Sequence, residues 1–262
     1  MRVPVLRGRN LLILNPRGYD PPMKKLAKVV LVMSILSWVS MGLGIGGYRV
    51  GLLGLKPALG IVAGVSVLSF LLSLLSMVTL FGTRPGKSGF PQAVVATLLT
   101  WSIAIPMGIQ FYRVRSFPKI HDISTDTEHP PLFNVLLTRR EGAVNSAIYG
   151  GVAIGRIQHE AYPDIVPLDF AASADVAFDR ALDVAKSLKW DIAAADKFAG
   201  RIEASVTSLF MAFTDDIVIR VEPKGPHESR VDIRSLSRVG LSDLGQNATR
   251  IRNYLSRFRG DH

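Results

Sequence analysis

Three stretches of this sequence contain no Asp, Glu, Lys or Arg. They run over residues 29–48, 57–83 and 88–112. A helix needs about 20 residues to cross a hydrocarbon layer about 30 Å thick, and each stretch is long enough. Inserting a charged side chain at the centre of a membrane helix costs about 2.5–3.5 kcal/mol. The absence of charged residues from these stretches therefore predicts three transmembrane helices. We place these helices at about 26–47, 58–81 and 91–112.

The net charge of the chain is divided in the same way. Residues 1–112 hold 11 of the 31 Lys and Arg residues but only one acid, Asp20. Residues 113–262 hold 20 basic and 20 acidic residues and are neutral overall. Basic residues that flank apolar segments are typical of membrane insertion, whereas DNA binding needs them clustered on one surface. We therefore expect the lipid bilayer as a partner, and no nucleic acid.

These observations predict three parts of the chain: a basic cytoplasmic N-terminal segment (1–25), a membrane domain (26–112) and a soluble domain (113–262). Transporters and proton pumps usually carry an ionisable residue at mid-depth in the membrane, and the three apolar stretches carry none. The membrane domain is therefore expected to be an anchor, or a surface for a membrane protein partner. A transporter subunit would need partner helices that supply the missing charge.

The basic residues also predict the orientation. Eight lie before the first helix or between the second and third: Arg2, Arg7, Arg9, Arg17, Lys24, Lys25, Arg84 and Lys87. Five lie on the other side: Arg49, Lys56, Arg113, Arg115 and Lys119. The positive-inside rule then puts the N-terminus in the cytoplasm. After three crossings of the cytoplasmic (inner) membrane, the soluble domain is expected to be extracytoplasmic, as a periplasmic domain.

The soluble domain shows an α+β pattern from about residue 168. Ser173 is a predicted N-cap, and apolar residues at helical spacing follow it. Four strands with alternating apolar and polar residues are expected next, in "WDIAAA", "GRIEASVTSLF", "DDIVIRVEP" and "SRVDIRSLSR". A last helix is expected to begin near Ser242. We predict an antiparallel four-stranded sheet with two helices packed on one face and water on the other.

Several segments of this domain resemble the domain-of-unknown-function family 1499. They are "IHDISTDTEHPPLF", "YPDIVPL" and the run "FTDDIVIRVEP…SRVDIRSLSRVGLSDLGQNATRIRNYL". The resemblance covers about residues 119–258 and leaves out the three apolar stretches. It implies a bacterial or plastid protein, often membrane-attached or exported, and it implies no biochemical activity.

The segment "HDISTDTEH" (121–129) concentrates histidines, acids and hydroxyls. A catalytic site here would combine a histidine, an orienting carboxylate and a hydroxyl nucleophile, drawn from His121, Asp122, Ser124, Thr125 and Asp126. A metal site would use four residues whose spacing matches no familiar pattern: His121, Asp126, Glu128 and His129. The favoured interpretation is that the acids and hydroxyls bond nearby backbone amides in turns where the chain leaves the membrane.

The segment "RSLSRVGLSDLGQNATRIR" (234–252) forms a second polar cluster, at a predicted strand end and helix start. A helix N-terminus with a nearby arginine can hold an anion. Alternatively, Arg238 and Asp243 pair and brace the corner, because buried polar groups usually satisfy one another. A ligand site would combine the two clusters through nine residues: His121, Asp122, Ser124, Thr125, Asp126, Ser235, Arg238, Asp243 and Asn247.

The chain has no cysteine, which excludes disulfides, thiolate catalysis and Cys-ligated zinc. We assign no catalytic residue, metal or cofactor. The favoured function is a membrane-anchored, non-enzymatic protein whose extracytoplasmic domain binds a partner protein or an amphipathic ligand. The alternative is a membrane-bound hydrolase-like enzyme that uses the 121–126 segment and the Arg238 corner.

Overall fold

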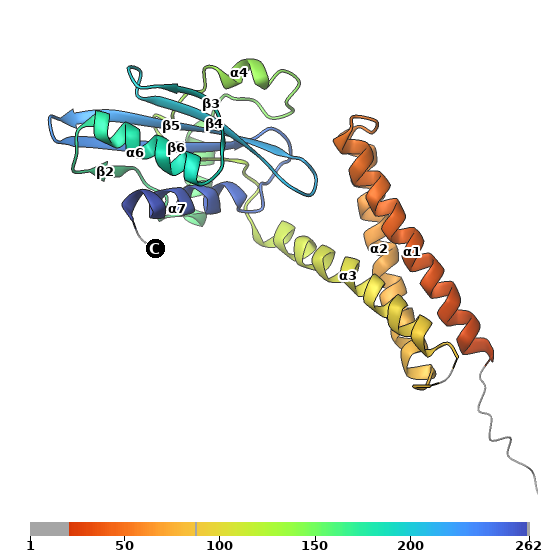
Figure 1. Ribbon diagram of the computed structural model, residues 1–262. Helices are drawn as coiled ribbons and strands as arrows, with labels where there is room; N and C mark the ends of the chain where they lie inside the picture. The colour runs from red at the N-terminus through yellow and green to blue at the C-terminus, as the bar shows by residue number, and fades with distance from the viewer. Residues whose placement is uncertain (1–20, 87, 261–262) are drawn as a thin grey trace, which may run out of the picture. The chain divides into compact units, whose positions relative to one another are not determined.

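The computed structural model describes residues 21–86 and 88–260, and the chain divides into two compact units between Met107 and Gly108. Three helices come first: α1 (Pro21–Arg49), α2 (Leu55–Gly82) and α3 (Phe90–Ser116) (Figure 1). All three are long and apolar enough to cross a membrane, which confirms the predicted helices. Most of the predicted basic segment 1–25 lies outside the described residues, as do five residues of the charge tally: Arg2, Arg7, Arg9, Arg17 and Lys87.

The side chains of these helices follow the pattern that is typical of helices in lipid. Buried hydroxyls bond carbonyls of their own helix, as Ser34 Oγ does to Val30 O (2.6 Å) and Thr100 Oγ1 to Ala96 O (2.9 Å). Large apolar side chains such as Val67 face outward and are exposed. In water such a surface would be unfavourable, whereas in lipid it is the expected one, because helix contacts in membranes are made by small and hydroxyl residues.

The second unit has an α+β fold, as predicted. Its elements are β1 (Asp122–Ser124), α4 (Leu136–Arg139), α5 (Gly151–Ala161), β2 (Leu168–Phe170), α6 (Ala174–Ser187), β3 (Asp191–Asp196), β4 (Arg201–Thr207), β5 (Thr214–Gly225), β6 (Glu228–Ser237) and α7 (Gln246–Arg259). The helices α6 and α7 pack on one face of the sheet, and α4 lies over the other face (Figure 1).

The sheet is antiparallel, but it has six strands where we predicted four. Its order is β1-β6-β5-β4-β3, and β2 also pairs with β6. The strand β1 pairs with residues 234–236 of β6 and β2 with residues 229–231, so the two share one edge of that strand. Each has only three residues, which is too short for alternation to reveal a strand in the sequence.

The helix-covered face forms the apolar core. Side chains at alternate positions of β5 and β6, including Ile217, Ile219 and Ile233, pack under α6 and α7. The ring of Trp190 stacks on Tyr254, with centroids 5.3 Å apart. The predicted N-cap is confirmed, since the hydroxyl of Ser173 accepts a hydrogen bond from the backbone N–H of Val176 in α6.

The last helix begins at Gln246 and not near Ser242. Leu244 and Gly245 have φ angles of 53° and 76°, in the left-handed region that an α-helix cannot use. The carboxylate of Asp243 accepts hydrogen bonds from the N–H groups of Gly245 (3.0 Å) and Asn247 (2.5 Å). Asp243 therefore supplies the acceptor for the first turn of α7 from outside the helix.

The second face of the sheet is covered, and the prediction of a wet face is wrong. Four charged residues on this face are fully buried: Glu203, Asp216, Asp232 and Arg234. The chain from residue 126 to residue 149, here named the covering segment, lies over them. Its residues Phe133 and Leu136 pack against Val218 and Leu236 of the sheet. The strands alternate as expected, but alternation within a strand does not show whether another segment of the chain covers its polar face.

Candidate functional site

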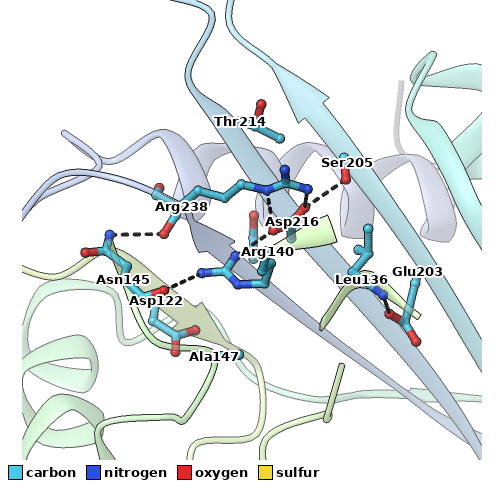
Figure 2. Close-up of polar contacts among 12 residues, drawn as sticks. Asp122, Leu136, Arg140, Asn145, Ala147, Glu203, Ser205, Thr214, Asp216 and Arg238 are labelled. Atoms are coloured by element: carbon cyan, nitrogen blue, oxygen red, sulfur yellow. Dashed lines mark hydrogen bonds and ion pairs between the residues drawn. The ribbon is translucent and has the colours of Figure 1, made fainter. Parts of the chain in front are cut away.

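Charged side chains of the covered face meet in a buried network. Asp216 accepts hydrogen bonds from Arg140 Nη1 (2.6 Å), from Arg238 Nε (2.9 Å) and Nη2 (2.8 Å), and from Ser205 Oγ (2.8 Å). Figure 2 shows both guanidinium groups pointing at this carboxylate. A carboxylate has about four acceptor positions, so these donors satisfy Asp216 completely.

A second ion pair connects β1 to β6. Arg234 Nε and Nη2 donate to the two oxygens of Asp122, at 2.9 and 2.8 Å. The same guanidinium donates to the carbonyls of Pro131 (3.1 Å) and Ala147 (2.8 Å), which lie near the two ends of the covering segment. Burial, together with the charge of Asp122, raises the pKa of the nearby Tyr149 hydroxyl to about 12. Arg234 therefore holds the covering segment on the sheet.

Asp126 stands at the start of the covering segment. Burial acts to raise its pKa, but its hydrogen bond from the N–H of His129 (2.8 Å) and its contacts with Arg220 and Arg230 outweigh this and lower the pKa. The N–H of Glu128 also donates to Asp126, at 3.1 Å. The predicted turn in which Asp126 bonds nearby amides is confirmed. Asp122 does not follow this prediction, because Arg234 binds its carboxylate.

Four of the nine predicted site residues come together at the start of α7. Asn247 Nδ2 donates to the carbonyl of His121 (2.9 Å) and to Ser237 Oγ (3.0 Å). Asn247 Oδ1 accepts from Ser235 Oγ (2.7 Å), and the Asn247 backbone N–H donates to Asp243. Burial raises the pKa of Asp243, although the hydrogen bonds that it accepts from two backbone N–H groups act to lower it. This corner joins the ends of β1 and β6 to the first turn of the helix.

The sheet separates the remaining residues from this corner. Asp122 lies opposite Leu236 in the register and Ile123 opposite Ser235, so the side chains of Asp122 and Ser235 point to opposite faces. Arg238 also lies on the covered face, where it pairs with Asp216. The predicted pairing of Arg238 with Asp243 is therefore wrong, since Arg238 binds Asp216 on the covered face, whereas Asp243 accepts two backbone N–H groups at the start of α7.

Ser124 and Thr125 are bound within the fold. The hydroxyl of Ser124 donates to the carbonyl of Asp126 (2.7 Å), and Thr125 Oγ1 donates to Asp232 (3.2 Å). The buried amide of Gln158 extends the sheet, because it accepts from the Ser124 N–H (2.9 Å) and donates to the Ser124 carbonyl (2.6 Å). These contacts stabilise the start of the covering segment. A ligand role for the nine residues stays a prediction.

No group of three or more Asp, Glu or His side chains is placed to hold a metal ion within residues 21–86 and 88–260. The buried carboxylates face guanidinium groups or backbone N–H groups. Glu203, for example, accepts the N–H groups of Asn134 (3.0 Å), Val135 (3.1 Å) and Leu136 (2.8 Å) at the start of α4.

An open groove between α6 and α7 was not predicted from the sequence. It has a volume of about 1120 Å³, and its lining mixes apolar, basic, acidic and neutral polar side chains: Phe170, Val176, Val184, Leu188, Arg180, Arg257, Asp183, Ser187, Asn253 and Ser256. The guanidinium of Arg180 lies 5.5 Å from the ring centroid of Phe170 and donates to the carbonyl of Phe258 (2.5 Å). The spacing of Val176, Arg180 and Val184 at every fourth position was the available signal, since it places them on one side of a helix.

The second unit matches a family model. The model described as "Protein of unknown function (DUF1499)" matches residues 122–258, just over half of the chain. The chain belongs to the DUF1499 family. The match begins at β1 and ends in α7, so it includes the sheet, the covering segment and the groove, whereas the three apolar helices lie outside it. The resemblance predicted from the sequence is confirmed. A search of curated proteins found no match to this chain.

Proposed function

We propose that this DUF1499 protein is a membrane-anchored binding protein whose soluble domain holds an amphipathic ligand with an acidic group. The groove between α6 and α7 carries this proposal, because it combines apolar walls with two guanidinium groups, which outnumber its one carboxylate, that of Asp183. Its volume of about 1120 Å³ is enough for a lipid-like molecule, since pockets for drug-sized ligands measure about 300–1,000 Å³.

The two kinds of lining suit the two parts of such a ligand. Val176 and Val184 of α6, and Leu188 directly after this helix, line the groove and offer apolar surface to a hydrocarbon chain. Arg257 of α7 is exposed at the groove and offers a charged donor to a carboxylate or phosphate. Arg180 is partly engaged by Phe258 and by the ring of Phe170, so Arg257 is the better placed of the two to bind the acidic group.

The three apolar helices support the same proposal. They are suited to hold the domain at a bilayer, which is a source of amphipathic molecules. In this proposal the domain lies on the extracytoplasmic side of the cytoplasmic membrane, as the charge tally of the sequence predicts.

A photoactivatable fatty acid tests the groove in the full-length chain in membranes. We expect covalent adducts in peptides of α6 and α7, and we expect excess unlabelled fatty acid to suppress them. A Val176→Asp variant should lower these adducts by about tenfold if it costs about 1.4 kcal/mol of ligand binding. The matched control is Val152→Asp, because Val152 is an exposed valine of α5 outside the groove.

A second pair of variants tests the acidic group. Arg257→Glu should weaken labelling, whereas Arg259→Glu, an exposed arginine of the same helix outside the groove lining, should not. Adducts in the three apolar helices serve as the internal reference for delivery of the probe. The proposal fails if the adducts are confined to those helices, or if both members of either pair behave alike.

A further inference from the structure

Two loops of the soluble domain display apolar side chains to solvent. The loop between β4 and β5 has the sequence "SLFMAF" (208–213), in which Leu209 is 91% and Phe210 50% exposed. The loop between β6 and α7 (239–244) carries Leu241, which is 79% exposed. A single exposed apolar side chain is common, but two neighbouring loops with apolar tips form a candidate contact surface.

The backbone of both loops is held in a defined turn. In the first loop, the N–H of Ser208 donates to the carbonyl of Phe213 (2.8 Å), and Ala212 has a φ of 53°. In the second, Gly240 has a φ of 96° and its carbonyl accepts a hydrogen bond from Asn145 Nδ2 (2.9 Å). The apolar tips are therefore presented by ordered turns.

The two loops leave the same end of the sheet. The N–H of Arg238, which follows β6, donates to the carbonyl of Thr214, the first residue of β5, at 3.0 Å. The first loop ends just before Thr214 and the second begins just after Arg238. Phe210 and Leu241 are thus carried by neighbouring turns.

This end of the sheet is also where the chain leaves α3. Ser242 Oγ donates to the carbonyl of Pro118 (2.8 Å), two residues after the end of α3. Arg113 Nη2, in the last turn of α3, donates to the carbonyl of Leu244 (2.8 Å). The ring of Phe117 packs against Gly245 so closely that a Cβ there would lie 2.4 Å from it. The second loop is therefore bound directly to the end of the helix.

The end of α3 has the composition of a membrane–water boundary. Phe111 and Tyr112 are exposed, and Arg113 and Arg115 follow them in the last turn. Aromatic and basic residues gather at this level of membrane helices. A loop that is hydrogen-bonded to Arg113 and Pro118 consequently lies at the level of the lipid headgroups if α3 crosses the membrane.

We infer that loops 208–213 and 239–244 insert their apolar tips into the headgroup region of the bilayer that α3 crosses. This inference rests on the membrane anchoring in the proposed function and adds a second contact with lipid. Continuity with α3 favours lipid over a protein partner. The charges agree, because Arg115 and Lys119 are exposed nearby, and the one acid of the two loops, Asp243, is buried.

The absence of cysteine makes a direct test simple, since each introduced thiol is the only one in the chain. Phe210→Cys and Leu241→Cys are labelled with an environment-sensitive fluorophore in the full-length chain, reconstituted in vesicles of zwitterionic and anionic phospholipids. Quenching by lipids with a spin label near the headgroup is then measured. The matched control is Phe198→Cys, a fully exposed phenylalanine in the β3–β4 turn at the other end of the sheet.

We expect several-fold stronger quenching, and a blue-shifted emission, at positions 210 and 241 than at position 198. Equal quenching at all three positions, or none at 210 and 241, overturns the inference. A Leu98→Cys label on the exposed side of α3 separates the two hypotheses. Quenching at Leu98 by deep spin labels without quenching in the loops rejects only the loop contact. No quenching at Leu98 rejects the membrane anchor as well.

Discussion

At the scale of single residues, the buried carboxylates of the second unit accept several hydrogen bonds each. Asp216 accepts hydrogen bonds from two arginines and a serine, and Glu203 accepts them from three backbone N–H groups. A buried ion pair adds little net stability over a well-packed apolar pair, but removing one partner leaves an uncompensated charge. These residues therefore determine which segments pack together more than they increase the total stability.

Replacing Arg234 with Met should strongly destabilise the domain. The variant leaves the Asp122 carboxylate buried without its guanidinium, and such a loss costs about 3–5 kcal/mol. The matched control is Arg252→Met, which removes the exposed pair with Asp164 and should cost less than about 1 kcal/mol. Chemical unfolding of the full-length chain in detergent, followed by near-UV circular dichroism, compares the two free energies of unfolding.

The double variant Asp122→Leu/Arg234→Met tests the cause of this loss. If the uncompensated charge is the cause, removing the carboxylate should recover a large part of the lost free energy. Equal stability of Arg234→Met and Arg252→Met would contradict the role of Arg234. A double variant no more stable than Arg234→Met would assign the loss to the bonds from Arg234 to Pro131 and Ala147.

At the scale of elements, the covering segment is what shields the second face of the sheet from water. It has one short helix, α4, of only four residues, so its own hydrogen bonds cannot fix its conformation. Glu203 of β4 supplies the acceptor for the first N–H groups of α4, and Arg140 just after α4 binds Asp216 of β5. The segment is therefore positioned by the strands beneath it.

Replacing Glu203 with Gln should loosen α4 locally. The glutamine has one amide oxygen for three N–H groups, and its NH2 would face those donors. Hydrogen exchange of the amides of residues 134–136 should become at least about tenfold faster, while exchange in α7 stays unchanged. In the control Glu222→Gln, an exposed position of β5, neither region should change. Unchanged exchange at residues 134–136 in Glu203→Gln would refute this role.

At the scale of the whole molecule, the chain combines three apolar helices with a second unit whose formal charges balance. The helices expose large apolar side chains, whereas the second unit encloses its own apolar core. Each part thus suits a different solvent. In a membrane, the orientation of such helices depends on the basic residues outside them.

The predicted orientation can be measured with introduced thiols in cells. A membrane-impermeant maleimide should label Phe198→Cys in cells with an intact cytoplasmic membrane, since the soluble domain is expected outside. It should label Ser88→Cys, an exposed and uncharged position in the connection between α2 and α3, only after permeabilisation. The reverse pattern would show that the soluble domain lies in the cytoplasm.

Some features of this protein followed from local patterns alone. Runs without charge predicted the three helices, and alternation in "DDIVIRVEP" and "SRVDIRSLSR" predicted the two central strands. The strands β1 and β2 were not predicted, because a strand of three residues is too short to show an alternation of apolar and polar residues. The groove was not predicted either, because its residues come mainly from β2, α6 and α7, and only folding places them side by side.

The sequence by itself determined three things: the division into an apolar part and a part without net charge, the α+β class, and the family. Hydropathy, charge and short-range periodicity suffice for these, because they are properties of neighbouring residues. Only the tertiary structure decided that Arg238 meets Asp216 and not Asp243, and that the polar face of the sheet is buried. Such pairings join residues far apart in the chain, and they depend on which face of a strand each side chain occupies.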